Sequence, residues 1–171
     1  MKKKVNKDTK KYQEEVIRKL KKKLLKLWSI NVRLKAGNKC EVLGCNATKK
    51  INAHHIENYN SHPLLRYNLK NGVALCPKCH RFGTQAAHTS FIFMYKFMTT
   101  IHPNLLEYLL NYKPSEEEII LILLEQKKIK EISEQKTIIN ILEQKIKEME
   151  AISFSLGEVI TKELVNSTSK K

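Results

Sequence analysis

Two pairs of cysteines constrain this sequence more than any other feature. Cys40 and Cys45 enclose the four residues EVLG, and Cys76 and Cys79 enclose Pro-Lys. Two close pairs joined by a longer spacer are typical of zinc sites, because each pair supplies two thiolates from a tight turn and four complete a tetrahedron. Four thiolates leave no open position for a substrate. We therefore expect a structural Zn²⁺ at these cysteines.

The spacer between the cysteine pairs is longer than in a simple zinc ribbon and carries further polar side chains. The run INAHHI predicts a short strand, on which His54 and His55 point to opposite sides. The Asn-Gly dipeptide at 71–72 predicts a turn, and the residues 73–75 predict a short returning strand. His80 follows the second cysteine pair, at a point where a helix can begin.

Histidine, histidine, asparagine and histidine in this order, around a cysteine cage, resemble the HNH endonuclease family. The resemblance is carried by the segments CEVLGC, AHHIENYNSHPLLRYNLKNGVALCPKCH and RFGTQAAH, and the middle segment looks like the phage and bacterial members. It covers residues 28–97 and implies a ββα-metal fold, in which a hairpin and a helix hold one catalytic divalent cation. It also implies a metal-dependent DNA endonuclease that leaves 5′-phosphate and 3′-hydroxyl ends.

The resemblance assigns roles to individual residues. His55 is expected to be the general base that takes a proton from the attacking water, since the pKa of imidazole lies near neutrality. Asn71 is expected to hold the loop that positions this base. His54 and His80 are expected to bind Mg²⁺ or another divalent cation, which neutralises phosphate charge and stabilises the leaving 3′ oxygen.

The third ligand of that cation is less certain from the pattern. Many relatives have a histidine four residues after the position of His80, where this chain has Thr84. The next histidine, His88, lies roughly 12 Å away if the helix is unbroken. We expect His88 to join the cation if Gly83 ends the helix.

The charge is concentrated in the first two-thirds of the chain. The net charge of +15 divides into +11 for residues 1–37, +6 for 38–113 and −2 for 114–171. This predicts a basic N-terminal helix, a nuclease core with the zinc site, and a C-terminal helical region. A basic chain favours a polyanionic partner, and we expect double-stranded DNA.

Seven basic side chains are candidates for phosphate contacts, with ordinary solvated charge as the alternative for each: Lys22, Lys26, Arg33, Lys35, Arg66, Lys70 and Arg81. We expect a helix from Phe91 to Thr99. The aromatic side chains around it are interpreted as core rather than as base-stacking groups: Phe91, Phe93, Tyr95, Phe97 and Tyr108.

The C-terminal region begins with a serine cap at Ser115 and Glu118 three positions later, a capping box. From there to Leu156 the sequence contains no Gly or Pro and predicts one helix. Its apolar stripe repeats every seven residues, with Ile139 and Ile146 among its members. The stripe fits either packing against the N-terminal helix or a coiled-coil homodimer.

The remaining features narrow the setting and leave two alternative functions open. The longest apolar run has six residues, 119–124, and a transmembrane helix needs about 20. The lysine-rich start lacks the apolar stretch of a signal peptide, so we expect a cytoplasmic protein, and the Lys/Ile/Asn-rich composition suits a phage or a low-GC bacterium. The main alternative is a non-catalytic, zinc-stabilised nucleic-acid-binding module. A weaker one is an interaction protein that recruits a nuclease through its C-terminal helix.

Overall fold

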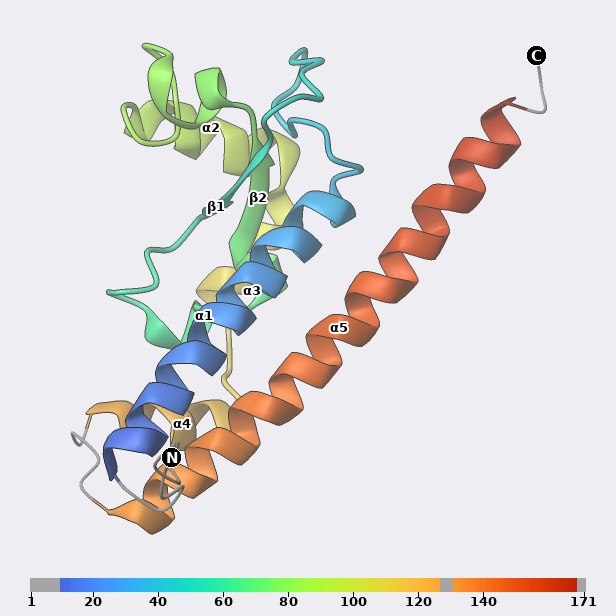
Figure 1. Cartoon of the computed structure of the whole chain (residues 1–171). Helices are drawn as coiled ribbons and strands as arrows, with labels where there is room; N and C mark the ends of the chain where they lie inside the picture. Colours follow the sequence, from blue (N-terminus) through green and yellow to red (C-terminus); the bar gives the residue numbers. More distant parts are fainter. Residues whose placement is uncertain (1–9, 127–130, 169–171) are drawn as a thin grey trace.

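The computed structural model describes residues 10–126 and 131–168 and is mainly helical, with one small antiparallel sheet (Figure 1). The helices are α1 (Lys10–Lys35), α2 (Phe91–Ile101), α3 (Pro103–Leu110), α4 (Glu116–Gln126) and α5 (Ile132–Thr168). The strands are β1 (Asn52–His55) and β2 (Gly72–Leu75), and the single-turn helices are η1 (Pro63–Leu65), η2 (Leu69–Asn71) and η3 (Lys78–Phe82). The expected helix after Phe91 and both strands of the hairpin are confirmed. Within the described ranges, no helix combines the length and apolar character that a bilayer crossing requires.

Helix α1 lies between the hairpin and α5, and it has a buried apolar face toward each (Figure 1). Toward the hairpin, Trp28 and Val32 pack with both strands and with α2. Toward α5, the buried side chains are those of Ile17, Leu24, Leu121, Ile138, Leu142 and Ile146. Among the described residues there are therefore two hydrophobic clusters, and α1 contributes to both.

Gly72 allows α1 to approach the hairpin closely. A Cβ atom at this position would overlap the side chain of Val32 and lie 2.8 Å from Cζ2 of Trp28. The turn expected at the Asn-Gly dipeptide is the end of η2, where Asn71 is the last residue before β2. The sequence makes Gly72 look like a turn residue, but its φ is −131° and its requirement is steric.

The single helix expected from Ser115 to Leu156 is wrong, because α4 and α5 are separate helices that pack against each other. Leu121 of α4 is buried in the cluster between α1 and α5, so the reversal covers an apolar side chain that one straight helix would leave exposed. The capping box is present, since Glu118 N donates to Ser115 Oγ at 3.3 Å and Ser115 N donates to Glu118 Oε2 at 2.9 Å. Of the two expected uses of the apolar stripe, α5 packs on α1. A homodimer through α5 remains a prediction.

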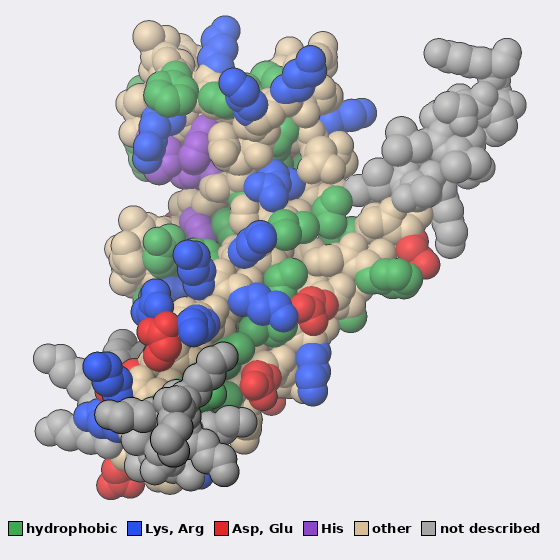
Figure 2. All heavy atoms as spheres, in the orientation of Figure 1, with side chains coloured by type: hydrophobic (Ala, Val, Ile, Leu, Met, Phe, Trp, Pro, Cys, Tyr) green, Lys and Arg blue, Asp and Glu red, His purple; other side chains and the backbone are tan. Residues whose placement is uncertain are grey.

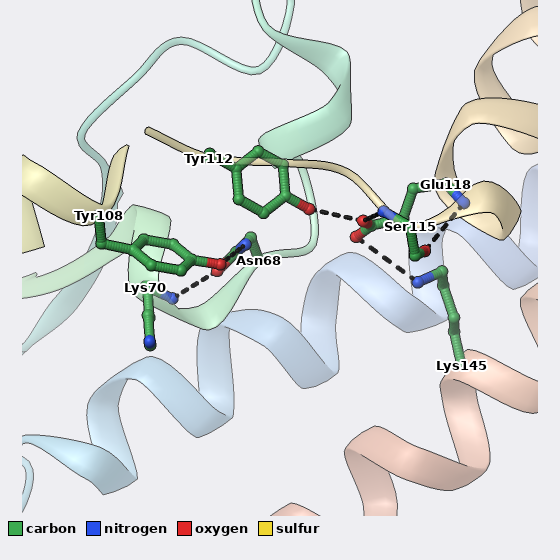
Figure 3. A network of polar contacts seen from close by, with 7 residues as sticks. All are labelled: Asn68, Lys70, Tyr108, Tyr112, Ser115, Glu118 and Lys145. Carbon is green, nitrogen blue, oxygen red and sulfur yellow. Dashed lines mark hydrogen bonds and ion pairs between the residues drawn. The ribbon is translucent and has the colours of Figure 1, made fainter. Parts of the chain in front are cut away.

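Two groups of polar contacts lie between the C-terminal helices and η2 (Figure 3), and they meet at the rings of Tyr108 and Tyr112, whose centroids are 5.6 Å apart. Glu118 accepts a hydrogen bond from the Tyr112 hydroxyl at 2.6 Å and lies 3.7 Å from Nζ of Lys145 on α5. Asn68, the residue before η2, donates to the Tyr108 hydroxyl at 2.9 Å. The carbonyl of Asn68 also accepts from Nε1 of Trp28 at 2.9 Å. The helices outside the hairpin thus brace the turn that leads into β2.

Candidate metal centre and base

The four predicted zinc ligands come together in one cluster, with all four sulfur atoms within 4.8 Å of one another. Cys40 and Cys45 lie in the loop after α1, Cys76 ends the hairpin, and Cys79 lies in η3. Sγ of Cys45 and Sγ of Cys76 are 3.7 Å apart, and all four thiols are free. A ZnS₄ tetrahedron with bonds of 2.3 Å has edges of about 3.8 Å, whereas a disulfide needs about 2.05 Å. The cluster therefore fits zinc and does not fit disulfides.

Burial also affects the protonation of the thiols. Burial raises the pKa of Cys40 and of Cys79, so that without an ion these groups are neutral at pH 7. A coordinated metal ion deprotonates a thiol outright. Binding of a cation at this cluster would therefore release protons.

Three histidines form a second cluster, and their ring nitrogens point toward one another. Nε2 of His80 lies 3.2 Å from Nδ1 of His54 and 3.1 Å from Nε2 of His88. For a metal–nitrogen bond of about 2.1 Å, neighbouring ligand atoms are about 3.0 Å apart in an octahedron and about 3.4 Å apart in a tetrahedron. The observed separations lie between these values, so the three imidazoles could bind one cation. Among the described residues, no carboxylate joins this group.

The chain reverses at Gly83, and this reversal brings His88 back to His80. A Cβ atom on Gly83 would lie 2.7 Å from the carbonyl oxygen of Lys78, so the turn η3 closes here only because the residue is glycine. His88 N then donates to the His80 carbonyl at 3.1 Å. The Thr89 hydroxyl donates to the Gly83 carbonyl at 3.0 Å. His88 was expected to reach the other two histidines if Gly83 ends the helix. In the structure Gly83 does end η3, and His88 lies beside His80.

The electrostatics of this cluster keep its nitrogen lone pairs available. Burial, followed by the charges of His80 and His88, lowers the pKa of His54 to about 3. Burial, followed by the charge of His88, also lowers the pKa of His80. Both rings are therefore neutral at pH 7, and a neutral imidazole is the form that coordinates a metal.

His55 lies on the other side of β1 and is held by two contacts. Its ring stacks on the indole of Trp28, with centroids 3.6 Å apart and planes inclined by 7°. Its Nε2 lies 2.9 Å from the Arg66 carbonyl oxygen, which can only accept a hydrogen bond. In the neutral ring Nε2 therefore carries the proton and Nδ1 carries the lone pair. Burial lowers the pKa of His55, so the neutral form prevails at pH 7.

Asn71 is fully buried and fixes the loop that contains this carbonyl group. Its Oδ1 accepts from Glu57 N at 2.8 Å, and its Nδ2 donates to the carbonyl oxygens of Glu57 at 2.9 Å and of Leu65 at 3.1 Å. Both ends of the loop between the strands are therefore tied to one side chain. The Arg66 carbonyl directly follows the second anchoring point. Asn71 therefore holds the loop whose Arg66 carbonyl lies against His55.

One open cleft of about 850 Å³ is lined by the three clustered histidines, His54, His80 and His88, and by His55. One wall is β1 with the residues that follow it, to Asn60, and the other wall is the segment from Ala87 through α2. Figure 2 shows histidine side chains in a hollow, with Lys and Arg side chains beside it and along the molecule below it. The cleft therefore joins a candidate cation site and a candidate base at a basic surface.

The basic candidates do not share one surface. Lys22, Lys26 and Arg33 recur at helical spacing on one side of α1, and the two lysines are exposed. Lys35 falls about half a turn from Lys26 around the helix axis, on the side away from them.

The remaining candidates lie closer to the histidines. Arg66 lies in the loop between the two strands, with Cζ 5.4 Å from the centroid of the Tyr59 ring. Arg81 is exposed beside His80 and its charge helps to lower the pKa of that residue. Lys70 is exposed, with Nζ 4.0 Å from the centroid of the Tyr108 ring.

Two features of the cleft were missed by the sequence analysis. No sequence pattern connects Trp28 with His55, which is 27 positions away and stacks on its indole ring. The aromatic residues of α2 were all interpreted as core, which is wrong for Phe91 and Tyr95: they are 84% and 59% exposed, whereas Phe97 is 3% exposed.

No model of a known protein family, no curated protein and no solved structure matches this chain.

Proposed function

We propose that this chain is a metal-dependent DNA endonuclease, and that β1, β2 and η3 form the ββα-metal arrangement of the HNH endonuclease family. The observation that carries the proposal is the convergence of three imidazole nitrogens in the same cleft as a fourth, separately held histidine. A structural role accounts for the cysteine cluster. It gives no reason for three uncharged histidines to converge beside an open cleft.

In this proposal His55 is the general base. Its Nδ1 takes a proton from the attacking water, while Nε2–H donates to the Arg66 carbonyl and keeps the ring in the required tautomer. Asn71 is a positioning residue, since it holds the loop that carries this carbonyl group. The phosphodiester bond would break to leave a 5′-phosphate and a 3′-hydroxyl.

His54, His80 and His88 would hold the catalytic cation, while the cysteines would hold structural zinc. When bound, the cation would supply charge neutralisation at the scissile phosphate and stabilisation of the leaving oxygen. The donor set bears on its identity, because imidazole suits transition metals and Mg²⁺ prefers oxygen ligands. We therefore propose Mn²⁺, Co²⁺, Ni²⁺ or Zn²⁺ ahead of Mg²⁺ as the activating ion.

A supercoiled-plasmid assay tests the proposal. Zinc-loaded protein is freed of other ions by gel filtration, so that no chelator removes the structural metal. Mn²⁺ and Mg²⁺ are then titrated separately. We expect nicking or linearisation that depends on added metal, begins at lower Mn²⁺ than Mg²⁺, and falls at least about 100-fold in His55→Ala, as for loss of a general base.

A matched histidine provides the control. His62 is exposed, pairs with Glu57 at 3.3 Å and lies outside the cleft lining, so His62→Ala should cut like the wild type. Full cleavage by His55→Ala would contradict the assignment of the base. No cleavage of plasmid, linear or single-stranded DNA by zinc-loaded wild type with any of these ions would contradict the nuclease and favour the binding module.

A further inference from the structure

Helix α2 presents two aromatic rings to solvent. Phe91 and Tyr95 are one helical turn apart, their centroids are 6.3 Å apart, and their planes are inclined by only 27°. Phe91 is 84% exposed and Tyr95 is 59% exposed. On the same helix Phe97 and Met98 are buried against the hairpin, so the packing of α2 does not require the two exposed rings.

Both rings line the cleft that contains the histidines. Across from them lie β1 and the half-buried ring of Tyr59, and the histidine cluster lies between the two walls. A cleft of about 850 Å³ is in the size range of small-molecule sites. One or two nucleotides of a single strand fit that space.

We propose that Phe91 and Tyr95 are a stacking platform for unpaired bases, and that the preferred substrate is therefore single-stranded or locally unpaired DNA, such as a bubble. This rests on the proposed nuclease function and names its substrate class. Aromatic rings bind unpaired bases of any sequence because every base has a π-face, whereas bases inside a duplex already stack on their neighbours. Positive charge beside such a platform follows the backbone of the strand.

The charge around the platform fits this occupant. The described α2 carries no acidic residue, and Arg81 is exposed next to His80. Glu57, the charged side chain among the described residues that line the cleft, pairs with His62 at 3.3 Å. A strand with its phosphate at the histidine cluster would have its neighbouring bases next to the two rings. Three acidic and nine basic residues in 38–113 favour an anionic partner over a neutral or basic one.

The test measures binding without cleavage. Zinc-loaded full-length protein, in buffer without added divalent cations, is titrated into fluorescein-labelled oligonucleotides of one sequence: a single strand, a perfect duplex, and the duplex with a central bubble. We expect the single strand and the bubble to bind more tightly than the duplex. Phe91→Leu and Tyr95→Leu keep an apolar side chain and remove the ring, and each should weaken binding of the two unpaired forms about tenfold.

Two variants serve as controls. Ile92→Ala removes an exposed apolar side chain from the neighbouring position of α2, which faces a separate apolar groove, and should leave binding unchanged. Phe91→Tyr keeps the ring and should bind like the wild type. Equal affinity for duplex and bubble, or equal weakening of both by the leucine variants, would overturn the platform and leave the nuclease standing. No binding to any of the three DNAs would overturn both.

Discussion

The two ligand clusters are built in opposite ways although they share one turn of the chain. Cys79 and His80 are adjacent residues of η3, yet one points to a cage of four sulfur atoms and the other to three nitrogen atoms in a cleft. The cysteine cluster is half-buried or buried throughout, whereas the third histidine, His88, is exposed. Four ligands complete a tetrahedron, and three leave positions for water or substrate. Under the proposed function, this difference would separate a site that holds the fold from a site that acts on a substrate.

The dependence between the clusters runs in one direction. The backbone of the second cysteine pair sets the start of η3, since His80 N donates to the Cys76 carbonyl at 2.8 Å. It also sets the return of the chain, since Ala87 N donates to the Cys79 carbonyl at 2.8 Å. Loss of the cysteine cluster should therefore dismantle the histidine cluster, while loss of a histidine should leave the cysteines in place.

The largest effect is expected for Cys79→Ser. Binding of structural zinc contributes directly to folding, and its loss should cost on the order of 5–15 kcal/mol, the whole stability of an ordinary domain. Trp28, the only tryptophan in the sequence, reports on this core because it is 2% exposed. We expect zinc content below one ion per chain and red-shifted tryptophan emission.

The hydrophobic cluster between α1 and α5 allows this experiment to distinguish loss of the zinc-bound core from loss of the whole fold. The contacts between α1 and α5 do not include the cysteines, so much of the helical circular dichroism should survive in Cys79→Ser. Native tryptophan emission together with absent zinc would contradict the structural role of the cysteine cluster.

His88→Ala tests whether the cysteine cluster stays intact when one histidine is lost. Removal of one of three ligands should weaken Mn²⁺ binding at least about 100-fold and abolish cleavage at moderate Mn²⁺. His88 is exposed, so the melting temperature should change little, with less than about 0.5 kcal/mol lost. Calorimetric titration with Mn²⁺ and zinc analysis of the same sample measure both. A matching loss of zinc would show that the two clusters are one cooperative unit.

We expect Asn71→Ala to leave the binding of zinc and of Mn²⁺ unchanged and to make His55 a less effective general base. The change leaves Glu57 N and the carbonyls of Glu57 and Leu65 without their partner, at a cost of about 2–4 kcal/mol. Thermal unfolding at equal zinc content measures the loss of stability. Cleavage below the melting temperature should also fall, because the Arg66 carbonyl is no longer fixed. An unchanged melting temperature would contradict the buried network.

Much of the site follows from sequence because it depends on local order. Cysteine spacing places four thiolates, and the two-residue period of a strand separates His54 from His55. His88 could not be placed the same way, because its position depends on a backbone contact between Gly83 and Lys78. The prediction of a single C-terminal helix was wrong for a similar reason. The sequence between Ser115 and Leu156 has no helix-breaking Gly or Pro, and burial of Leu121 against α5 accounts for the division into two helices.

The sequence also does not show which aromatic side chains are buried and which line the cleft. Helix α2 has apolar side chains on all sides, so its sequence does not indicate which of them are buried. Only the position of the hairpin shows that Phe97 faces the core and Phe91 the cleft. The role of Trp28 is equally invisible in the sequence, because it depends on α1 lying across the hairpin at Gly72.

The smallest effect, and the most informative about the base, is expected for Trp28→Phe. Phenylalanine keeps the apolar volume toward the core, loses the hydrogen bond to the Asn68 carbonyl, and offers a smaller face to His55. We expect kcat to fall severalfold, to about a tenth, with KM and Mn²⁺ affinity unchanged, because one hydrogen bond and part of a stack are each worth about 1 kcal/mol.

Val32→Ala is the matched control for this variant. Val32 packs in the same cluster and over the same Gly72, and it makes no ring contact with His55. Its truncation should lower stability by about 1 kcal/mol or more and leave kcat unchanged well below the melting temperature. If both variants lower kcat in proportion to the stability that they lose, then Trp28 acts only as packing. If only Trp28→Phe lowers kcat, the stack positions the base, and α1 belongs to the catalytic unit as well as to the core.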